Sequence, residues 1–171
     1  MHELCRDFFL MKIHTFRKRT LIACPIDDVF AFFSDAGNLE RLTPSFLNFK
    51  ILTPLPIEMK QGALIEYQIK LFGIKMRWLT EITNWEPNRR FSDVQRKGPY
   101  LLWDHEHRFR SVGNSTLMVD TVRYAVPAGI LEPIAHLLFV RRRVQEIFEY
   151  RERAIAKLFK SAQAGDVAVC N

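Results

Sequence analysis

The sequence is short of features that mark several common protein classes. It has only three cysteines, Cys5, Cys24 and Cys170, an odd number with no CxxC spacing. We therefore expect neither a disulfide framework nor a cysteine-based zinc site, and a reducing, cytoplasmic compartment is the natural one. No apolar run approaches the roughly 20 residues of a membrane-spanning helix, and the apolar stretch near the N-terminus is too short for a signal-peptide core.

Motifs for nucleotide and hydrolase chemistry are also missing. The chain contains no GxGxxG, P-loop, GxSxG or HExxH pattern, so nucleotide cofactors and the usual hydrolase or zincin mechanisms have no support. The net charge of +6 is weak evidence for a nucleic-acid partner. Aromatic platforms within a basic groove, which single-strand binders require, are not apparent. We predict no cofactor and no nucleic-acid partner.

Apolar and aromatic residues are abundant instead. Hydrophobic residues make up 48% of the chain and aromatic residues 12%, with 14 phenylalanines, which excludes general disorder. A chain of 171 residues is most simply one domain, with a large core or a core hollowed by a pocket. We place this domain at residues 12–160, after an N-terminal extension at 1–11, with Met11 as a second candidate start, and before a flexible tail at 161–171.

The most informative motif is the segment GPYLLWDHEHRF. Side chains alternate between the two faces of a strand, so Leu101, Trp103, His105, His107 and Phe109 share one face and charged residues take the other. A purely structural core normally uses Val, Ile and Leu there, because a buried imidazole needs hydrogen-bond partners. The pattern indicates a sheet whose concave face lines an apolar cavity with a few polar groups.

The remaining pattern predicts a β-rich domain closed by a helix. Residues 14–22 favour a first strand, Pro25 begins a short helix, and Asn38 begins a second short helical turn. The connections that follow are too short for crossover helices, so the strands should pair antiparallel. We expect these strands at residues 46–53, 63–71, 74–85, 89–96 and 115–126, with the histidine-bearing strand before the last.

After Pro127 the apolar period changes from two residues to about 3.6. This predicts one long amphipathic helix from Pro133 to about Lys160. Its stripe of apolar side chains needs a wide surface to cover, and the concave face of the sheet is the candidate.

Several short motifs carry a resemblance to a known family. They are Pro25 with Val29-Phe30-Ala31-Phe32-Phe33, Asn38-Leu39 with Leu42-Thr43-Pro44, Trp85-Glu86-Pro87, Phe91 with Asp93 and Gln95, Gly98-Pro99-Tyr100 with Trp103, His105 and His107, and Ile147-Phe148-Glu149-Tyr150-Arg151. With the order of elements, they make residues 12–160 similar to the SRPBCC (START/Bet v 1-like) superfamily, and most similar to its bacterial polyketide cyclase/dehydrase-like proteins.

The resemblance implies an α+β helix-grip fold. In it, a curved antiparallel sheet of about seven strands wraps around a long C-terminal helix, and two short helices follow the first strand. The superfamily includes lipid carriers, hormone and polyketide binders, ring-closing enzymes and chaperone activators, so the fold does not decide the activity.

Asp93, His105 and His107 are the candidate catalytic residues. A neutral imidazole can accept or donate a proton near pH 7, and a carboxylate can orient it. The alternatives are polar contacts to a bound ligand, or hydrogen bonds among these groups alone. A metal held by both histidines and Asp93 is a further alternative, but HxH without denser ligands is common by chance, and we predict no metal.

A wider set of residues is predicted to bind ligand. It comprises Tyr67, Met76, Trp78, Phe91, Asp93, Gln95, Trp103, His105, His107, Phe109, Asp120 and Arg151. Arg151 occupies an apolar position of the helix stripe, so it either reaches a carboxylate or phosphate in the cavity or extends to solvent. Asp120 is its expected partner within the fold. For the large aromatic side chains, a packed core is the alternative to a binding site.

Arg141, Arg142 and Arg143 form the densest basic run. We interpret it as a solvated helix face, with a transient contact to an anionic membrane surface as the alternative.

These observations lead to two main functional hypotheses. The first is binding or transport of a small hydrophobic molecule (a lipid, a polyketide-like or an aromatic compound) between the sheet and the long helix. The second is a cyclase- or dehydratase-type enzyme that uses a cavity histidine as general acid or base. An interaction role through the basic helix face is a third.

Overall fold

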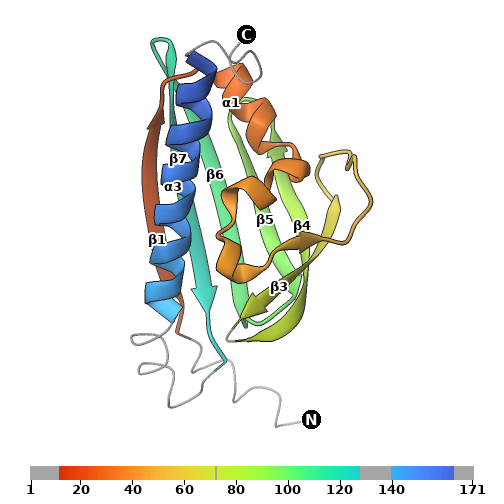
Figure 1. Ribbon diagram of the computed structural model, residues 1–171. Helices are drawn as coiled ribbons and strands as arrows, with labels where there is room; N and C mark the ends of the chain where they lie inside the picture. Colours follow the sequence, from red (N-terminus) through yellow and green to blue (C-terminus); the bar gives the residue numbers. More distant parts are fainter. Residues whose placement is uncertain (1–11, 72, 128–139, 164–171) are drawn as a thin grey trace.

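The computed structural model describes residues 12–71, 73–127 and 140–163 (Figure 1). In chain order its elements are β1 (His14–Ile22), α1 (Ile26–Phe33), the short 3-10 helices η2 (Ala36–Asn38), η3 (Glu40–Leu42) and η4 (Ser45–Leu47), β2 (Lys50–Ile51), β3 (Leu64–Leu71), β4 (Ile74–Glu86), β5 (Arg90–Lys97), β6 (Leu102–Val112), β7 (Ser115–Ala125) and α3 (Arg141–Gln163).

The strands form one antiparallel sheet in the order β1-β7-β6-β5-β4-β3-β2. Successive strands pair as a meander, and β1 joins the open side of β7. The helices all lie on one face, with α3 over β1 and β7 and the shorter helices in front of β4 and β5 (Figure 1). This arrangement confirms the predicted α+β helix-grip architecture with seven strands and a long C-terminal helix.

The helix α1 begins where the sequence predicts. Pro25 occupies the N-cap, and Asp27 and Asp28 lie in the first turn, where negative charge interacts favourably with the helix dipole. The helix buries phenylalanines against the sheet, and Phe30 contacts Phe109 with 5.4 Å between ring centroids. Much of the hydrophobic core therefore lies beneath α1.

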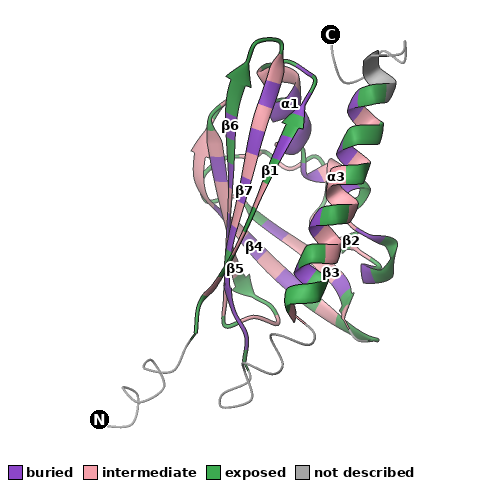
Figure 2. Ribbon diagram, turned by 90° about the vertical axis from the view of Figure 1, so that its left-hand side faces the viewer, coloured by how far each residue is buried: buried purple, intermediate pink, exposed green. Residues whose placement is uncertain are grey.

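The helix α3 packs one stripe of side chains toward the sheet (Figure 2). Val144, Phe148, Ile155 and Phe159 are buried at steps of four and seven residues, as the period of 3.6 predicts. The predicted start at Pro133 lies outside the described residues. The helix runs to Gln163, three residues beyond the predicted end.

One local prediction is wrong. The strand expected at residues 46–53 is reduced to β2, because Ser45–Leu47 form a 3-10 helix and Asn48 has a left-handed backbone with φ of 43°. The helical turn expected after Asn38 is present as η3, and a separate 3-10 turn, η2, precedes it, with the Asp35 carboxylate accepting a hydrogen bond from the Gly37 amide at 2.8 Å.

Cysteine chemistry also departs from expectation. Cys24 is buried and disulfide-bonded, and its partner lies outside the described residues. A single disulfide is not the framework that the sequence argues against, but it departs from the expectation of reduced cysteines, because spacing along the chain does not determine which cysteines a fold brings together. The argument for a reducing compartment loses its basis, and the cytoplasmic location stays a prediction. Among the described residues, no helix combines the length and apolar character needed to span a bilayer.

Candidate ligand-binding site

A cavity of about 460 Å³ lies between the concave face of the sheet, α3 and the short helices. This volume is within the range of small-molecule sites. Strands β3 and β4 supply much of its apolar wall, including Ile65, Ile69 and Ile82. The cavity is therefore bounded by residues far apart in the sequence.

Most of the sequence-predicted site residues line this cavity. They are Tyr67, Trp78, Phe91, Asp93, Trp103, His105, His107 and Arg151. The aromatic rings lie against one another, with centroids 5.7 Å apart for Tyr67 and Trp78 and 5.4 Å apart for Trp78 and Trp103. The structure thus brings residues of β3, β4, β5, β6 and α3 into one wall.

Met76, Gln95, Phe109 and Asp120 are not part of the cavity wall. Phe109 belongs to the core beneath α1. The Gln95 side chain turns to the β5–β6 loop, where its amide donates to the Tyr100 carbonyl at 2.7 Å and accepts from the Tyr100 amide at 3.3 Å. Met76 is half-buried near the β3–β4 turn. Asp120 lies beneath the two histidines and is 1% exposed.

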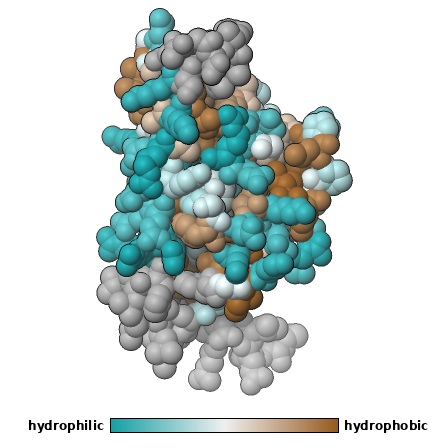
Figure 3. Space-filling model, viewed as in Figure 1, coloured by the Kyte–Doolittle hydropathy of each residue, from teal (hydrophilic) through white to brown (hydrophobic). Residues whose placement is uncertain are grey.

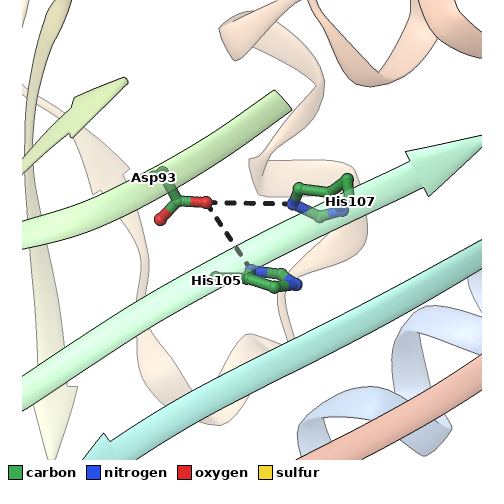
Figure 4. A group of neighbouring side chains, drawn as sticks. All are labelled: Asp93, His105 and His107. Atoms are coloured by element: carbon green, nitrogen blue, oxygen red, sulfur yellow. Dashed lines mark ion pairs between the residues drawn. The ribbon is translucent and has the colours of Figure 1, made fainter. Parts of the chain in front are cut away.

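Asp93 and the histidines meet because of strand register. Asp93 is paired with His105 across β5 and β6, and Asp120 is paired with His107 across β6 and β7. Asp93 Oδ2 lies 3.6 Å from His105 Nδ1 and 3.8 Å from His107 Nε2 (Figure 4). The imidazole rings are 3.9 Å apart at their centroids. All four side chains form one buried polar cluster.

Asp120 contacts both histidines. Its Oδ1 is 3.1 Å from His105 Nε2 and 2.7 Å from His107 Nδ1. Burial raises the pKa of Asp120, but the two imidazoles outweigh this and hold it below its usual range, so the carboxylate is ionised. An ionised carboxylate only accepts hydrogen bonds, so His105 Nε2 carries hydrogen, whereas His107 Nδ1 is close to Asp120 but is not aligned for a hydrogen bond. The lone pair of His105 Nδ1 then faces Asp93, and His107 Nε2 lies on the same side.

Burial shifts the pKa values of the other three residues of the cluster, His105, His107 and Asp93. Desolvation lowers the pKa of His105 and of His107, which keeps both imidazoles neutral at neutral pH. Desolvation likewise raises the pKa of Asp93. The cavity floor thus combines neutral imidazoles with carboxyl groups in a water-poor setting.

Three residues at the cavity carry buried nitrogen atoms that have no hydrogen-bond partner among the described residues. The atoms are Trp78 Nε1, His107 Nδ1, and Nε and Nη1 of Arg151. Arg151 Nη1 is 3.7 Å from Asp120 Oδ1, which is within ion-pair range but too long for a hydrogen bond. A buried donor without a partner costs about 1–3 kcal/mol, so this wall favours an acceptor.

A family model for polyketide cyclase / dehydrase and lipid transport proteins matches residues 22–149. The chain belongs to this family. Zhui aromatase/cyclase from Streptomyces sp. R1128 is 18% identical, with a TM-score of 0.71 over 91% of this chain and 100% of that one. TTHA0849 from Thermus thermophilus is 20% identical, with a TM-score of 0.65 over 87% and 99%.

A third similar structure is norcoclaurine synthase from Thalictrum flavum in complex with dopamine and hydroxybenzaldehyde. It is 13% identical, with a TM-score of 0.65 over 90% of each chain. These likenesses show a shared fold. A comparison with curated proteins found no match.

The cavity of this polyketide cyclase/dehydrase family member also contains residues that the sequence analysis did not include in the site. Alternation along the strand could have identified Thr80 and Ile82, because they point to the same face as Trp78. Tyr100 lies in a loop, and Phe46 and Ile147 come from helices. Nothing in their local sequence indicates a cavity, because the packing of helices on the sheet determines which of their side chains face it.

Arg143 is the member of the basic run of α3 that lines the cavity. Arg142 and Arg143 both pair with Glu146, at 3.0 and 2.8 Å. The Arg143 guanidinium also lies 5.1 Å from the Phe46 ring centroid. The face that bears α3 is largely hydrophilic (Figure 3). Contact between Arg141–Arg143 and an anionic membrane stays a prediction.

Proposed function

We propose that this protein binds, and carries, a small and largely apolar molecule that presents a carboxylate or carbonyl oxygen to Arg151. The observation that carries the proposal is a cavity of about 460 Å³ with aromatic walls and buried donors that lack partners among the described residues. Membership of a family that includes lipid transport proteins supports it.

The aromatic walls supply the affinity in this proposal. Burial of apolar surface contributes about 25 cal/mol per Å², so about 400 Å² contributes about 10 kcal/mol. Micromolar binding requires about 8 kcal/mol, which leaves a margin for ordering the ligand. Tyr67, Trp78 and Trp103 offer this surface together in one wall.

Arg151 supplies the selectivity. Its side chain is only 13% exposed and its guanidinium lies 5.4 Å from the Phe148 ring centroid, so a bound oxygen would meet it away from bulk water. Hydrogen bonds to a charged group contribute about 1.5–3 kcal/mol. We therefore expect a preference of about 10- to 100-fold for a ligand with an acidic end over its neutral analogue.

The test compares dodecanoic acid with dodecan-1-ol, which differ only in the head group. Displacement of a fluorescent hydrophobic probe gives both affinities for the wild type, Arg151→Gln and Arg153→Gln. Arg153 is exposed on the same helix and serves as the matched control. Arg151→Gln should weaken acid binding at least 10-fold and leave alcohol binding unchanged. Equal losses in both arginine variants, or no displacement by either compound, would contradict the proposal.

A cyclase- or dehydratase-type enzyme is the second candidate. One observation favours it: His105 Nδ1 carries a lone pair beside Asp93 at the cavity wall, with His107 Nε2 3.8 Å from the same carboxylate. A general base needs a free lone pair within reach of substrate. In His105→Ala and His107→Ala, catalysis on a polyketide-like β-carbonyl substrate predicts loss of turnover with binding largely kept. A carrier predicts altered affinity alone.

A further inference from the structure

We propose that Asp93, His105 and His107 bind a divalent metal ion of the zinc class at the cavity wall, with Asp120 holding both histidines in position. The ligand atoms are Asp93 Oδ2, His105 Nδ1 and His107 Nε2. The site departs from the sequence prediction of no metal, because the sequence alone did not show how closely the fold brings Asp93 to the histidines.

The spacing of the three atoms supports a metal. All lie within 4.8 Å of one another, and the carboxylate oxygen is 3.6 and 3.8 Å from the two nitrogens. These separations are too long for hydrogen bonds, which end near about 3.2 Å. Zinc bonds of about 2.0–2.1 Å place tetrahedral ligand atoms about 3.4 Å apart. A small contraction of the cluster therefore suffices for coordination.

The orientation of the two histidine rings also supports a metal site. Asp120 accepts a hydrogen bond from His105 Nε2 and lies 2.7 Å from His107 Nδ1, so His105 Nδ1 and His107 Nε2 are the ring nitrogens turned toward Asp93. A cation at the point where these two nitrogens and the carboxylate oxygen converge would contact all three. A second carboxylate that orients metal-binding histidines is the usual arrangement around catalytic metal ions.

The position of the cluster also suits a divalent ion. Three protein ligands leave a coordination position open, and all three residues line the cavity. The open position would take an oxygen of the bound molecule or water.

The experiment titrates Zn²⁺ into the chelator-treated full chain by isothermal calorimetry. We expect one ion per chain in the wild type and at least 100-fold weaker binding in Asp93→Asn and His107→Gln. Asp120→Asn should weaken binding about 10- to 100-fold, as expected for a residue that orients ligands. Asp104→Asn is the matched control, since Asp104 lies on the opposite face of β6 and pairs with Arg123. It should bind as the wild type does.

Cobalt spectroscopy provides a second readout. Co²⁺ in the wild type should give ligand-field bands of a tetrahedral nitrogen–oxygen site, absent in Asp93→Asn. Asp93→Asn preserves shape, so it decides the question even where a histidine variant unfolds. A thiolate–cobalt band, no stoichiometric binding, or equal zinc affinity in the wild type and Asp93→Asn would overturn the proposal. Dodecanoic acid binding measured with chelator present tests the cavity separately.

Discussion

Asp120 offers the sharpest test of how the buried polar cluster is held together. Replacing it by alanine removes the acceptor that lies 3.1 Å from His105 Nε2 and 2.7 Å from His107 Nδ1. The buried His105 N–H left without a partner costs about 1–3 kcal/mol, and His107 loses its charged neighbour. The Arg151 guanidinium adds less, because it is 3.7 Å away and borders the cavity. We expect Asp120→Ala to lower the free energy of unfolding by about 3–5 kcal/mol, the usual cost of breaking a buried ionic network.

Urea denaturation followed by circular dichroism measures this loss, with chelator present so that metal binding does not contribute. The m-value should stay constant if the folded state keeps its shape. Asp104→Ala is the control, because Asp104 pairs with Arg123 on the outer face of the same hairpin. An exposed pair contributes about 1 kcal/mol or less. A loss in Asp120→Ala as small as that in Asp104→Ala would refute the account of the cluster.

Two further substitutions test the cavity and its rim. Gly98→Ala would place a Cβ against the Gln95 amide and displace it from Tyr100, so we expect a loss of about 1–2 kcal/mol in urea denaturation; unchanged stability would contradict this role of Gln95. Ile69→Trp should fill the cavity and weaken dodecanoic acid binding at least 10-fold while the melting temperature stays near that of the wild type. Undiminished binding would place the ligand elsewhere.

Strand alternation predicts the polar half of the site well. The alternation of β6 places His105 and His107 on the buried face, and pairing with β5 brings Asp93 and Phe91 opposite them. The prediction holds because a shift of one residue would move both histidines to the solvent side. Leu101 shows where the rule ends, since it precedes β6 and is 59% exposed.

The same rule fails where the backbone departs from regular pairing. Gln95 shares the parity of Phe91 and Asp93, yet the register between β4 and β5 shifts beside Thr80 and the Gln95 side chain turns to the loop. Asn48 likewise ends the expected second strand through its left-handed backbone. Such irregularities depend on tertiary contacts, so alternation along one strand does not reveal them.

The carrier and metal proposals are linked, because a bound metal ion would change the charge that the ligand contacts in the cavity. The histidine lone pairs that would coordinate zinc are also those a general base requires, so a bound ion excludes His105 and His107 from that role. Zinc would add positive charge to a cavity wall that already carries Arg151. Zinc should therefore raise the preference of the wild type for dodecanoic acid over dodecan-1-ol. The same addition should leave the preference of Asp93→Asn unchanged, because that variant retains the cavity and Arg151 but lacks a ligand atom.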